Sequence, residues 1–260
     1  MNDAPIPAAF DETPRRPRGW IDAITLLRNF ALVTFDVEPA ALARVLPGGL
    51  RPEVRRLDDG RERAFVSAVS FRDVDFRFQS AQVVKVSFNQ TNYRAYVLGP
   101  GGERAVHFFE TTLDSRTAVI PRRLWSMPWY GGRTTIEATW DGDRCTGYRH
   151  VCTGARNAVD AEFTGTDAPL GRLDGFVDTD DAAAVITHPL KGWFVRPDGG
   201  LGRYSVWHPR LRPTLGTTIR ARYGVFERLG LVAPDAVPHS VLLQPEVEFD
   251  VHLPPTRGTA

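Results

Sequence analysis

The sequence predicts a mostly β domain of the α+β class, built as a closed antiparallel β-barrel or curved sheet with a few rim helices. Three observations lead to this prediction. Apolar or alternating segments of strand length outnumber segments with helical periodicity. Short glycine- and aspartate-rich turns separate several of them, which favours antiparallel neighbours. The sequence has no internal repeat at the period of a propeller or solenoid.

The first half of the chain supplies most of the expected strands. A strand at 29–35 precedes a short helix within 36–47, which is framed by Pro39 and Pro47 and has Leu42 and Val45 on one apolar face. Glycine and proline at 99–102 mark the turn of a hairpin, since they tolerate or fix turn geometry. Strands are expected at 64–71, 74–76, 83–88, 93–98 and 104–110.

The second half begins with a helix expected at 115–125, capped by Asp114 or Ser115 and kinked or restarted at Pro121. A glycine- and aspartate-rich loop is expected at 164–181. The remaining elements are a hairpin at 134–140 and 144–152, a short helix at 182–186, strands at 203–207 and 219–226, and a closing strand at 240–253 interrupted at Pro245.

Length and charge bound the domain organisation and the partners. Residues 1–19 carry four prolines and no apolar period, so we expect a disordered tail followed by one domain over 20–260. Lys and Arg total 32 against 31 Asp and Glu, so neither nucleic acid nor a membrane surface is an expected partner. There is no apolar run of about 20 residues and no signal-like N-terminus, so we expect a cytoplasmic protein.

Cysteine and lysine are scarce, and this limits the chemistry. Cys145 and Cys152 form neither a disulfide framework nor a four-ligand zinc site, and on one strand their odd spacing predicts opposite faces. The six histidines are scattered without a paired metal motif, so no metal and no cofactor are implied. Because Lys85 and Lys191 are the only lysines, an amine nucleophile must be one of them or the N-terminus.

Two adjacent arginines, Arg122 and Arg123, stand among Pro121, Leu124 and Trp125. One interpretation is a solvated charge pair on a helix surface, which contributes little to stability. The other is a partly buried site at which the guanidinium groups need an anion. Composition alone leaves both interpretations open.

Several segments together carry a resemblance to a known family. In their order and spacing, the chain resembles the acetoacetate decarboxylase-like superfamily, and more closely its uncharacterised DUF2071 branch. The resemblance covers about 28–253, nearly all of the expected domain. The segments that carry it are 32–42, 46–50, 88–97, 113–119, 121–124 and 247–254.

The resemblance implies a closed β structure around a mostly apolar pocket. The decarboxylases of the superfamily use a lysine in a Pro-Lys-Lys-Leu motif to form a Schiff base, and the two lysines fall on Arg122 and Arg123. A guanidinium stays protonated and cannot form that imine. The family's glutamate falls on Gln90, which is neither an acid nor a base, and its arginine before the first strand matches Arg28, which would hold a substrate carboxylate.

We therefore predict Arg122, Arg123 and Gln90 as catalytic residues. Predicted substrate-binding residues are Arg28, Asn92, Arg94, Tyr96 and Trp125, of which Asn92, Arg94 and Tyr96 match the DUF2071 pattern without an established role.

Three functional hypotheses follow. The first is an enzyme, lyase-like, that decarboxylates, dehydrates or cyclises a small anionic oxo-acid or polyketide-like metabolite by electrostatic stabilisation. The second is a non-catalytic carrier or sensor of such an anion on the same fold. In the third, the arginine pair is structural and binds Glu110 or Asp114. Because superfamily members are commonly oligomeric, a homo-oligomer is expected.

Overall fold

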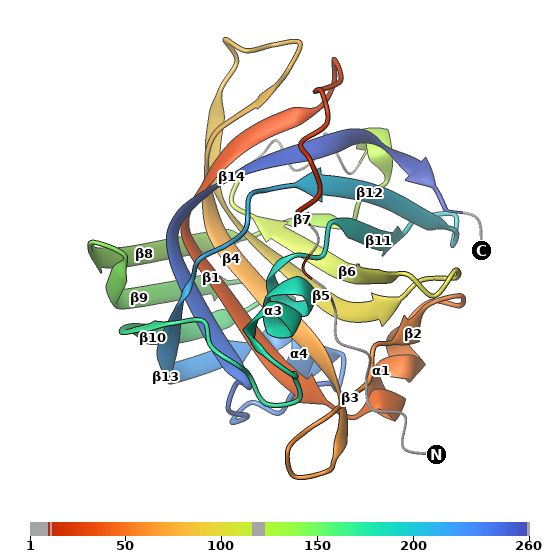
Figure 1. Cartoon of the computed structure of the whole chain (residues 1–260). Coiled ribbons are helices and arrows are strands. Elements are labelled where there is room, and N and C mark those ends of the chain that lie inside the picture. The colour runs from red at the N-terminus through yellow and green to blue at the C-terminus, as the bar shows by residue number, and fades with distance from the viewer. Residues whose placement is uncertain (1–9, 11, 116–122, 259–260) are drawn as a thin grey trace.

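The sheet closes into a barrel, one of the two forms expected from the sequence, and seven strands form it (Figure 1). The computed structural model describes residues 10, 12–115 and 123–258. Neighbouring strands of the barrel are antiparallel except β6 and β11, which run parallel. In barrel order the strands are β1 (Ala23–Val37), β4 (Glu62–Phe78), β5 (Val86–Leu98), β6 (Arg104–Leu113), β11 (Lys191–Val195), β12 (Leu201–Trp207) and β14 (Ser240–Arg257), which pairs again with β1.

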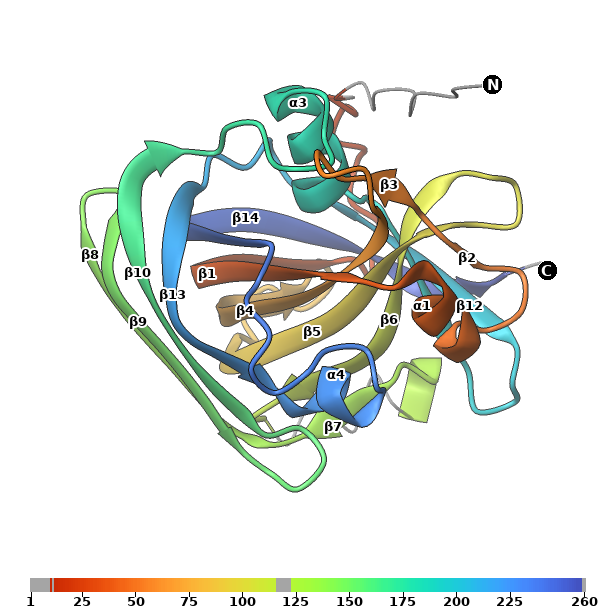
Figure 2. The same cartoon turned by 90° about the horizontal axis from the view of Figure 1, so that it is seen from below.

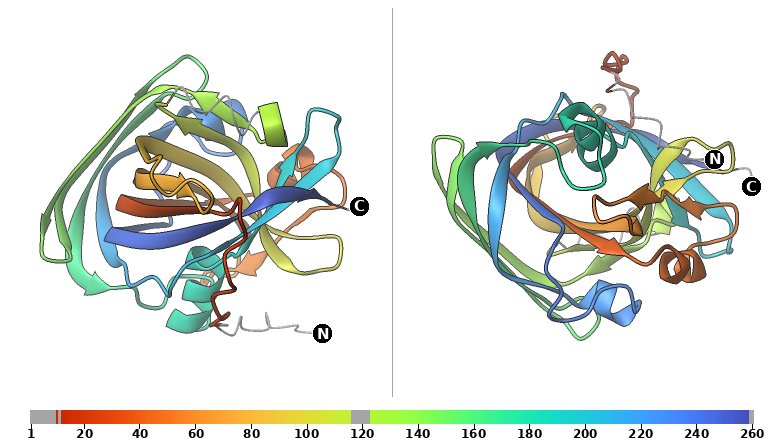
Figure 3. Two further views of the ribbon diagram at one scale, coloured as in Figure 1. Left: turned by 90° about the horizontal axis from the view of Figure 1, so that it is seen from above. Right: turned by 60° about the horizontal axis from the view of Figure 1, so that its bottom comes forward.

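A second layer of strands covers one outer side of the barrel (Figures 2 and 3). It continues the sheet from the first residues of β14. Its strands are β13 (Thr214–Tyr223), β10 (Val159–Pro169), β9 (Arg144–Thr153) and β8 (Arg133–Asp141). The short elements are β2 (Arg51–Pro52), β3 (Arg55–Arg56), β7 (Trp129–Gly131), α1 (Pro39–Val45), α3 (Thr179–Ala182), the π-helical η2 (Ala183–Thr187) and α4 (Gly224–Arg228).

The second layer gives β1, β4 and β5 two buried faces. Alternate residues of a strand point to opposite faces, so one strand serves two cores. In β5, Tyr93 and Ala95 belong to the outer core between the two layers, whereas Tyr96 belongs to the inner core inside the barrel. In β1, Val33 contacts the outer core and Leu32 the inner one. Polar residues at inward positions of β5 therefore lie inside the barrel.

A bulge at Asn29 changes which residues of β1 point inward. Asn29 has a φ of 53°, and the pairing of β1 with β4 shifts between Arg28 and Ala31. Leu27 and Phe30 consequently both join the inner core. The pairing of β1 with β14 passes over the same position, opposite Pro245. The predicted interruption of β14 is therefore wrong, because the residue without an N–H falls where no pair forms.

The helical segment α3–η2 is inserted into one end of the barrel, where Val185 and Ile186 pack in the inner core. A buried ion cluster holds it there. Arg55 Nη1 donates to Asp181 Oδ2 at 2.9 Å, and Arg55 Nη2 donates to Glu53 Oε1 at 3.1 Å. The side chains of Arg55, Glu53 and Asp181 are at most 7% exposed. Removing one partner of such a buried pair strongly destabilises the fold, because the charge of the other partner then stays buried without compensation.

The described part of the N-terminal segment lies along the barrel and differs from the tail expected over 1–19. Arg15 Nε donates to Asp250 Oδ2 at 2.6 Å, and Arg18 Nη2 forms an ion pair with Glu248 at 3.0 Å. Trp207 Nε1 donates to the carbonyl of Thr13 at 3.0 Å. The acidic partners are more than 200 residues away in sequence, so local composition gave no sign of this docking.

Several local predictions also need correction. Cys145 and Cys152 both lie in the outer core, because the register shift beside Trp140 cancels the alternation between them. Both cysteines are free. Residues 164–169 continue β10 and are not a loop, and Phe226 belongs to α4. Of the helix expected at 115–125, residues 116–122 lie outside the described chain and 123–125 are helical. None of the helices described here has the length and apolarity needed to cross a membrane.

The ion cluster at α3 predicts a large difference between two adjacent aspartates. We expect Asp181→Ala to lower the free energy of unfolding by about 3–5 kcal/mol, because it leaves the Arg55 charge buried and uncompensated. Asp180 pairs with Arg210 at the surface, so Asp180→Ala should cost less than about 1 kcal/mol. Urea denaturation of both variants measures the difference, and equal losses would contradict this role of the cluster.

Candidate functional site

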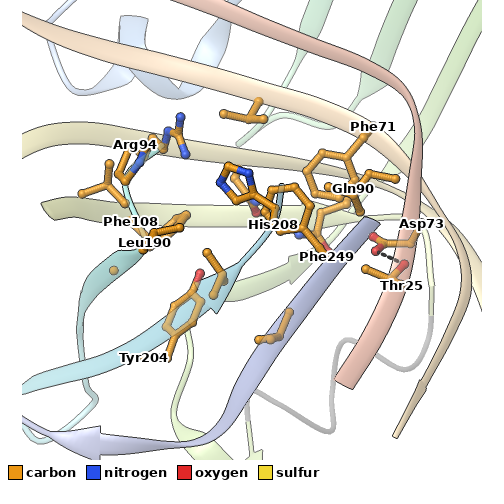
Figure 4. Close-up of a pocket in the computed structure, with 18 of the residues that line it drawn as sticks. Thr25, Phe71, Asp73, Gln90, Arg94, Phe108, Leu190, Tyr204, His208 and Phe249 are labelled. Carbon is orange, nitrogen blue, oxygen red and sulfur yellow. Dashed lines mark hydrogen bonds between the residues drawn. The ribbon is translucent and has the colours of Figure 1, made fainter. Parts of the chain in front are cut away.

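A cavity of about 100 Å³ lies inside the barrel, and all seven barrel strands contribute lining residues (Figure 4). Most of the lining is apolar or aromatic, including Leu27, Phe71, Phe108, Trp125 and Phe249. A mostly apolar cavity with a few polar groups is the usual form of a small-molecule site. The polar groups therefore determine what it can bind.

Strand β5 contributes a row of three polar side chains, Gln90, Asn92 and Arg94. They are two residues apart, which puts all three on the inner face of the strand. Gln90 Nε2 donates to Asn92 Oδ1 at 2.9 Å, and Thr111 Oγ1 donates to the same oxygen at 2.9 Å. Because a glutamine amide has two N–H groups, Gln90 has a second donor for a ligand.

Arg94 places a positive charge at one end of the cavity. Its Nη2 donates to the carbonyl of Ile186 at 3.0 Å and to Tyr96 Oη at 3.3 Å. Among the described residues, its buried Nε has no hydrogen-bond partner, and the partners of its Nη2 are a carbonyl and a hydroxyl, neither of which carries a negative charge. Arg94 is half-buried, and removing part of a charge from water without a counter-ion is unfavourable. A bound anion would compensate this charge.

His208 lies near Arg94 in the view of the cavity and is 3% exposed (Figure 4). Its Nδ1 is 2.9 Å from the carbonyl oxygen of Pro209, which can only accept, so we assign the proton to Nδ1. The ring stacks on Phe249 with centroids 4.4 Å apart. Burial, with the nearby positive charge of Arg94, lowers the pKa of His208 to about 3. At neutral pH this side chain is uncharged and offers Nε2 as an acceptor.

Asp73 lies at the other end of the cavity, next to Gln90 and Phe71 (Figure 4). Thr25 Oγ1 donates to Asp73 Oδ1 at 2.9 Å, whereas Oδ2 is buried and has no partner among the described atoms. The residue is 3% exposed. Burial raises the pKa of the Asp73 carboxyl to about 7, and the negative charge of Asp114 adds to the rise.

Sequence reasoning missed Asp73, although a signal was available. Val69 and Phe71 precede it at two-residue spacing, and both belong to the inner core. An aspartate that continues the inward positions of a buried strand is rarely structural unless paired. The mutual placement of Asp73 and Arg94 depends on strand register, which the sequence does not give.

The structure brings four predicted site residues to the cavity wall, namely Gln90, Asn92, Arg94 and Trp125. Tyr96 is the next inward residue of β5 and donates its hydroxyl to the carbonyl of Ile186 at 3.0 Å. The roles predicted for these residues stay predictions.

The predicted arginines other than Arg94 lie elsewhere or outside the description. Arg28 points outward, half exposed, and its Nε lies 3.2 Å from Glu246, because the Asn29 bulge turns Leu27 and Phe30 inward. Arg123 is exposed on the helical turn at 123–125, and Arg122 lies outside the described residues.

The two lysines occupy different positions. Lys191, an exposed residue of β11, contributes to the cavity lining, whereas Lys85 forms an ion pair with Asp75 at 2.8 Å. Within the part of the chain that the structure describes, no group of three or more His, Cys, Asp or Glu side chains could hold a metal ion.

Comparison with known proteins identifies a family and a fold. The model of the DUF2071 family, described as an uncharacterized conserved protein, matches residues 25–248. No curated protein matches the chain. Among solved structures, the acetoacetate decarboxylase of Legionella pneumophila aligns with a TM-score of 0.60 and 12% identity, over 96% of this chain and 92% of that one.

Two further structures have similar scores. The enduracididine biosynthesis enzyme MppR, complexed with the condensation product of pyruvate and imidazole 4-carboxaldehyde, aligns with a TM-score of 0.61 and 14% identity over 98% of both chains. An acetoacetate decarboxylase-like enzyme from Sphingomonas wittichii aligns with a TM-score of 0.59 and 12% identity, over 98% of this chain and all of that one. At these identities, the likeness shows the fold.

The buried carboxyl of Asp73 predicts a pH-dependent stability difference. Because its folded pKa of about 7 lies above the usual value of 3.8, its contribution to stability is largest below pH 3.8 and is lost as the pH rises to 7. Asp73→Asn removes this loss. We therefore compare the free energy of unfolding of Asp73→Asn with that of wild type at each pH. Between pH 5 and pH 8, this difference should shift in favour of the variant by about 2–3 kcal/mol, since one pKa unit corresponds to about 1.4 kcal/mol.

Urea denaturation at the two pH values measures this difference. The control is Asp75→Asn on the same strand, at a half-exposed carboxylate that pairs with Lys85. Its difference from wild type should change little between the two pH values. A difference for Asp73→Asn that is the same at pH 5 and pH 8 would rule out a buried carboxyl with a raised pKa.

Proposed function

Since the chain belongs to the DUF2071 family and has the acetoacetate decarboxylase-like fold, we propose that it binds a small anionic oxo-acid or polyketide-like molecule in the barrel cavity. We further propose that it acts on this ligand as a lyase without a Schiff base. The ligand class is supported by MppR, a relative in fold that is described in complex with pyruvate, itself a small oxo-acid.

Arg94 is the observation that carries the proposal. Its guanidinium lines an apolar cavity, and within the described chain no carboxylate compensates it. Hydrogen bonds to Tyr96 Oη and to the carbonyl of Ile186 fix its position without neutralising its charge. A carboxylate bound here would form a charge-assisted hydrogen bond with Nε, which is buried although the side chain as a whole is only half-buried.

The remaining polar groups suit electrostatic catalysis. The second N–H of Gln90 can donate to a carbonyl oxygen of the ligand, and this interaction strengthens when the oxygen becomes an enolate. Asn92 orients Gln90 through a hydrogen bond of 2.9 Å. Decarboxylation of a 3-oxo acid gives such an enolate, and so does proton abstraction next to a ketone ahead of dehydration or cyclisation. The roles proposed for Arg122 and Arg123 rest on the sequence resemblance.

A carrier or sensor of the same anion is the second candidate. The observation that favours it is that the positions of the Schiff-base lysine pair hold arginines. Binding is expected from both candidates, and product formation only from the lyase. We therefore measure binding by calorimetry and products by chromatography on one panel of pyruvate, acetoacetate, 4-oxopentanoate and 7-oxooctanoate.

Arg94→Gln tests the anion site. We expect at least one panel member to bind wild type, and the substitution to weaken it by about 2 kcal/mol or more, roughly 30-fold in Kd, because the counter-charge is lost. Arg72→Gln is the matched control, since Arg72 is exposed on the neighbouring strand β4. If Arg94→Gln and Arg72→Gln both bind as wild type does, Arg94 is not the anion site.

Borohydride reduction tests for a covalent imine. With pyruvate or acetoacetate present, we expect the intact mass of the protein to stay unchanged, because the predicted mechanism forms no Schiff base. The exposed Lys191 at the cavity wall makes this a demanding test. An adduct on Lys191 or Lys85 would contradict the proposed mechanism and leave anion binding at Arg94 intact.

A further inference from the structure

We propose that Asp73 is the general base of this cavity and that its substrate is an extended keto acid, with the carboxylate at Arg94 and the ketone near Gln90 and Asp73. The inference rests on the proposed function and specifies its substrate class and its proton-transfer residue. It concerns a residue outside the positions that the family resemblance assigns to chemistry.

The separation of the two charged ends determines the length of the ligand. Strand pairing places Arg94 opposite Ser67 and Gln90 opposite Phe71, and Asp73 lies two residues beyond Phe71. Along β4, Asp73 is therefore six residues from Ser67, the residue opposite Arg94, which corresponds to roughly 20 Å at about 3.3 Å per residue. The close-up shows Arg94 and Asp73 on opposite sides of the cavity (Figure 4). Pyruvate and acetoacetate are too short to reach both residues.

The middle of the cavity fits a chain with few polar groups. Phe71, Phe108 and Phe249 line it together with Leu27. Burial of methylene groups against such a surface contributes about 0.8 kcal/mol each. A ligand with a carboxylate at one end, an aliphatic or aromatic middle and a ketone at the other end is complementary to this order of groups.

The contacts of Asp73 leave one oxygen for chemistry. Oδ1 accepts the hydrogen bond from Thr25, which orients the carboxyl group, while Oδ2 has no partner in the described chain. Most buried carboxyl oxygens in proteins have a hydrogen-bond partner, so the unpaired Oδ2, which faces the cavity wall, is available to a ligand. Among the described groups that act on its pKa, Asp114 is charged and Thr25 is neutral, and burial is the largest cause. A pKa of about 7 suits a base that works near neutral pH.

The proposed step is the abstraction of a proton from the carbon next to the ketone. A C–H bond of the substrate breaks, and the proton forms an O–H bond with Asp73 Oδ2. The electron pair of the C–H bond moves into a C=C bond, and the carbonyl π pair moves onto the oxygen, which becomes an enolate that accepts from Gln90 Nε2. The reverse step returns a proton to carbon. In D₂O, the acid group of Asp73 exchanges with solvent and deuterium is returned instead.

A chain-length series tests the substrate class. Calorimetry with 4-oxopentanoate, 7-oxooctanoate and 9-oxodecanoate should show affinity rising with length, and Arg94→Gln should weaken every member that binds, because the carboxylate is common to all three. If 4-oxopentanoate binds as tightly as 9-oxodecanoate, the extended substrate class is wrong. If none of the three binds but pyruvate or acetoacetate does, the extended substrate class is also wrong while the proposed function stands, and if no keto acid of either series binds, the proposed function itself fails. These results are therefore distinguishable.

Deuterium exchange tests the base. We expect wild type to exchange the protons next to the ketone of 9-oxodecanoate in D₂O, followed by proton NMR and corrected for the rate without protein. Asp73→Asn should bind this probe within a few-fold of wild type and exchange at least 100-fold more slowly. The assignment of the base would be overturned if Asp73→Asn exchanged these protons at the wild-type rate. It would also be overturned if wild type bound the probe without exchanging them.

The pH profile of the wild-type protein provides a second readout that needs no variant. Because the carboxylate is the active form, the corrected exchange rate should rise with pH and level off above about pH 7. Binding through Arg94 should stay constant over the same range. A corrected rate independent of pH between 5 and 8 would exclude Asp73 as the base, whatever the behaviour of Asp73→Asn.

Discussion

The structure depends on the burial of three strands, β1, β4 and β5, on both faces. Each polar side chain on these strands must then find a partner inside the protein. Most do so. Ser70 of β4 and Thr91 of β5, for example, lie within hydrogen-bond distance of His150 on β9, at 3.1 and 3.2 Å, and burial lowers the pKa of that histidine to about 3. Among the described atoms of these strands, Asp73 Oδ2, Arg94 Nε, Asn89 Oδ1 and Tyr93 Oη depart from this pattern, and of these four residues Asp73 and Arg94 line the cavity.

The helical segment α3–η2 connects the fold to the proposed site. The last carbonyls of a helix have no partner within it. Here Arg94 and Tyr96 donate to the carbonyl of Ile186, near the end of η2. The same segment is anchored at its beginning by Asp181, which pairs with Arg55. The position of the Arg94 guanidinium therefore depends on the buried Arg55–Asp181 ion pair, which holds the other end of the same helical segment.

Alternation along single strands was readable from the sequence, whereas pairing between strands was not. The hairpin turns follow from local residue types, whereas Gln90, Asn92, Arg94 and Tyr96 were selected by the family resemblance. The structure continues one strand through 86–98 and puts these four residues on its inner face. Bulges were not visible. The one at Asn29 leaves Arg28 at the surface, and the shift at Trp140 brings both cysteines into one core. Each extra residue reverses the faces of all that follow.

The electrostatic site was harder to predict for the same reason. Asp73 and Arg94 belong to different strands, and register puts them at two ends of one cavity. A structure of the protein with 9-oxodecanoate bound is the most direct test of this electrostatic site. We predict the carboxylate within hydrogen-bond distance of Arg94 Nε, and the carbon next to the ketone beside Asp73 Oδ2. A ligand bound outside the barrel, or bound inside with its carboxylate away from Arg94, would contradict it.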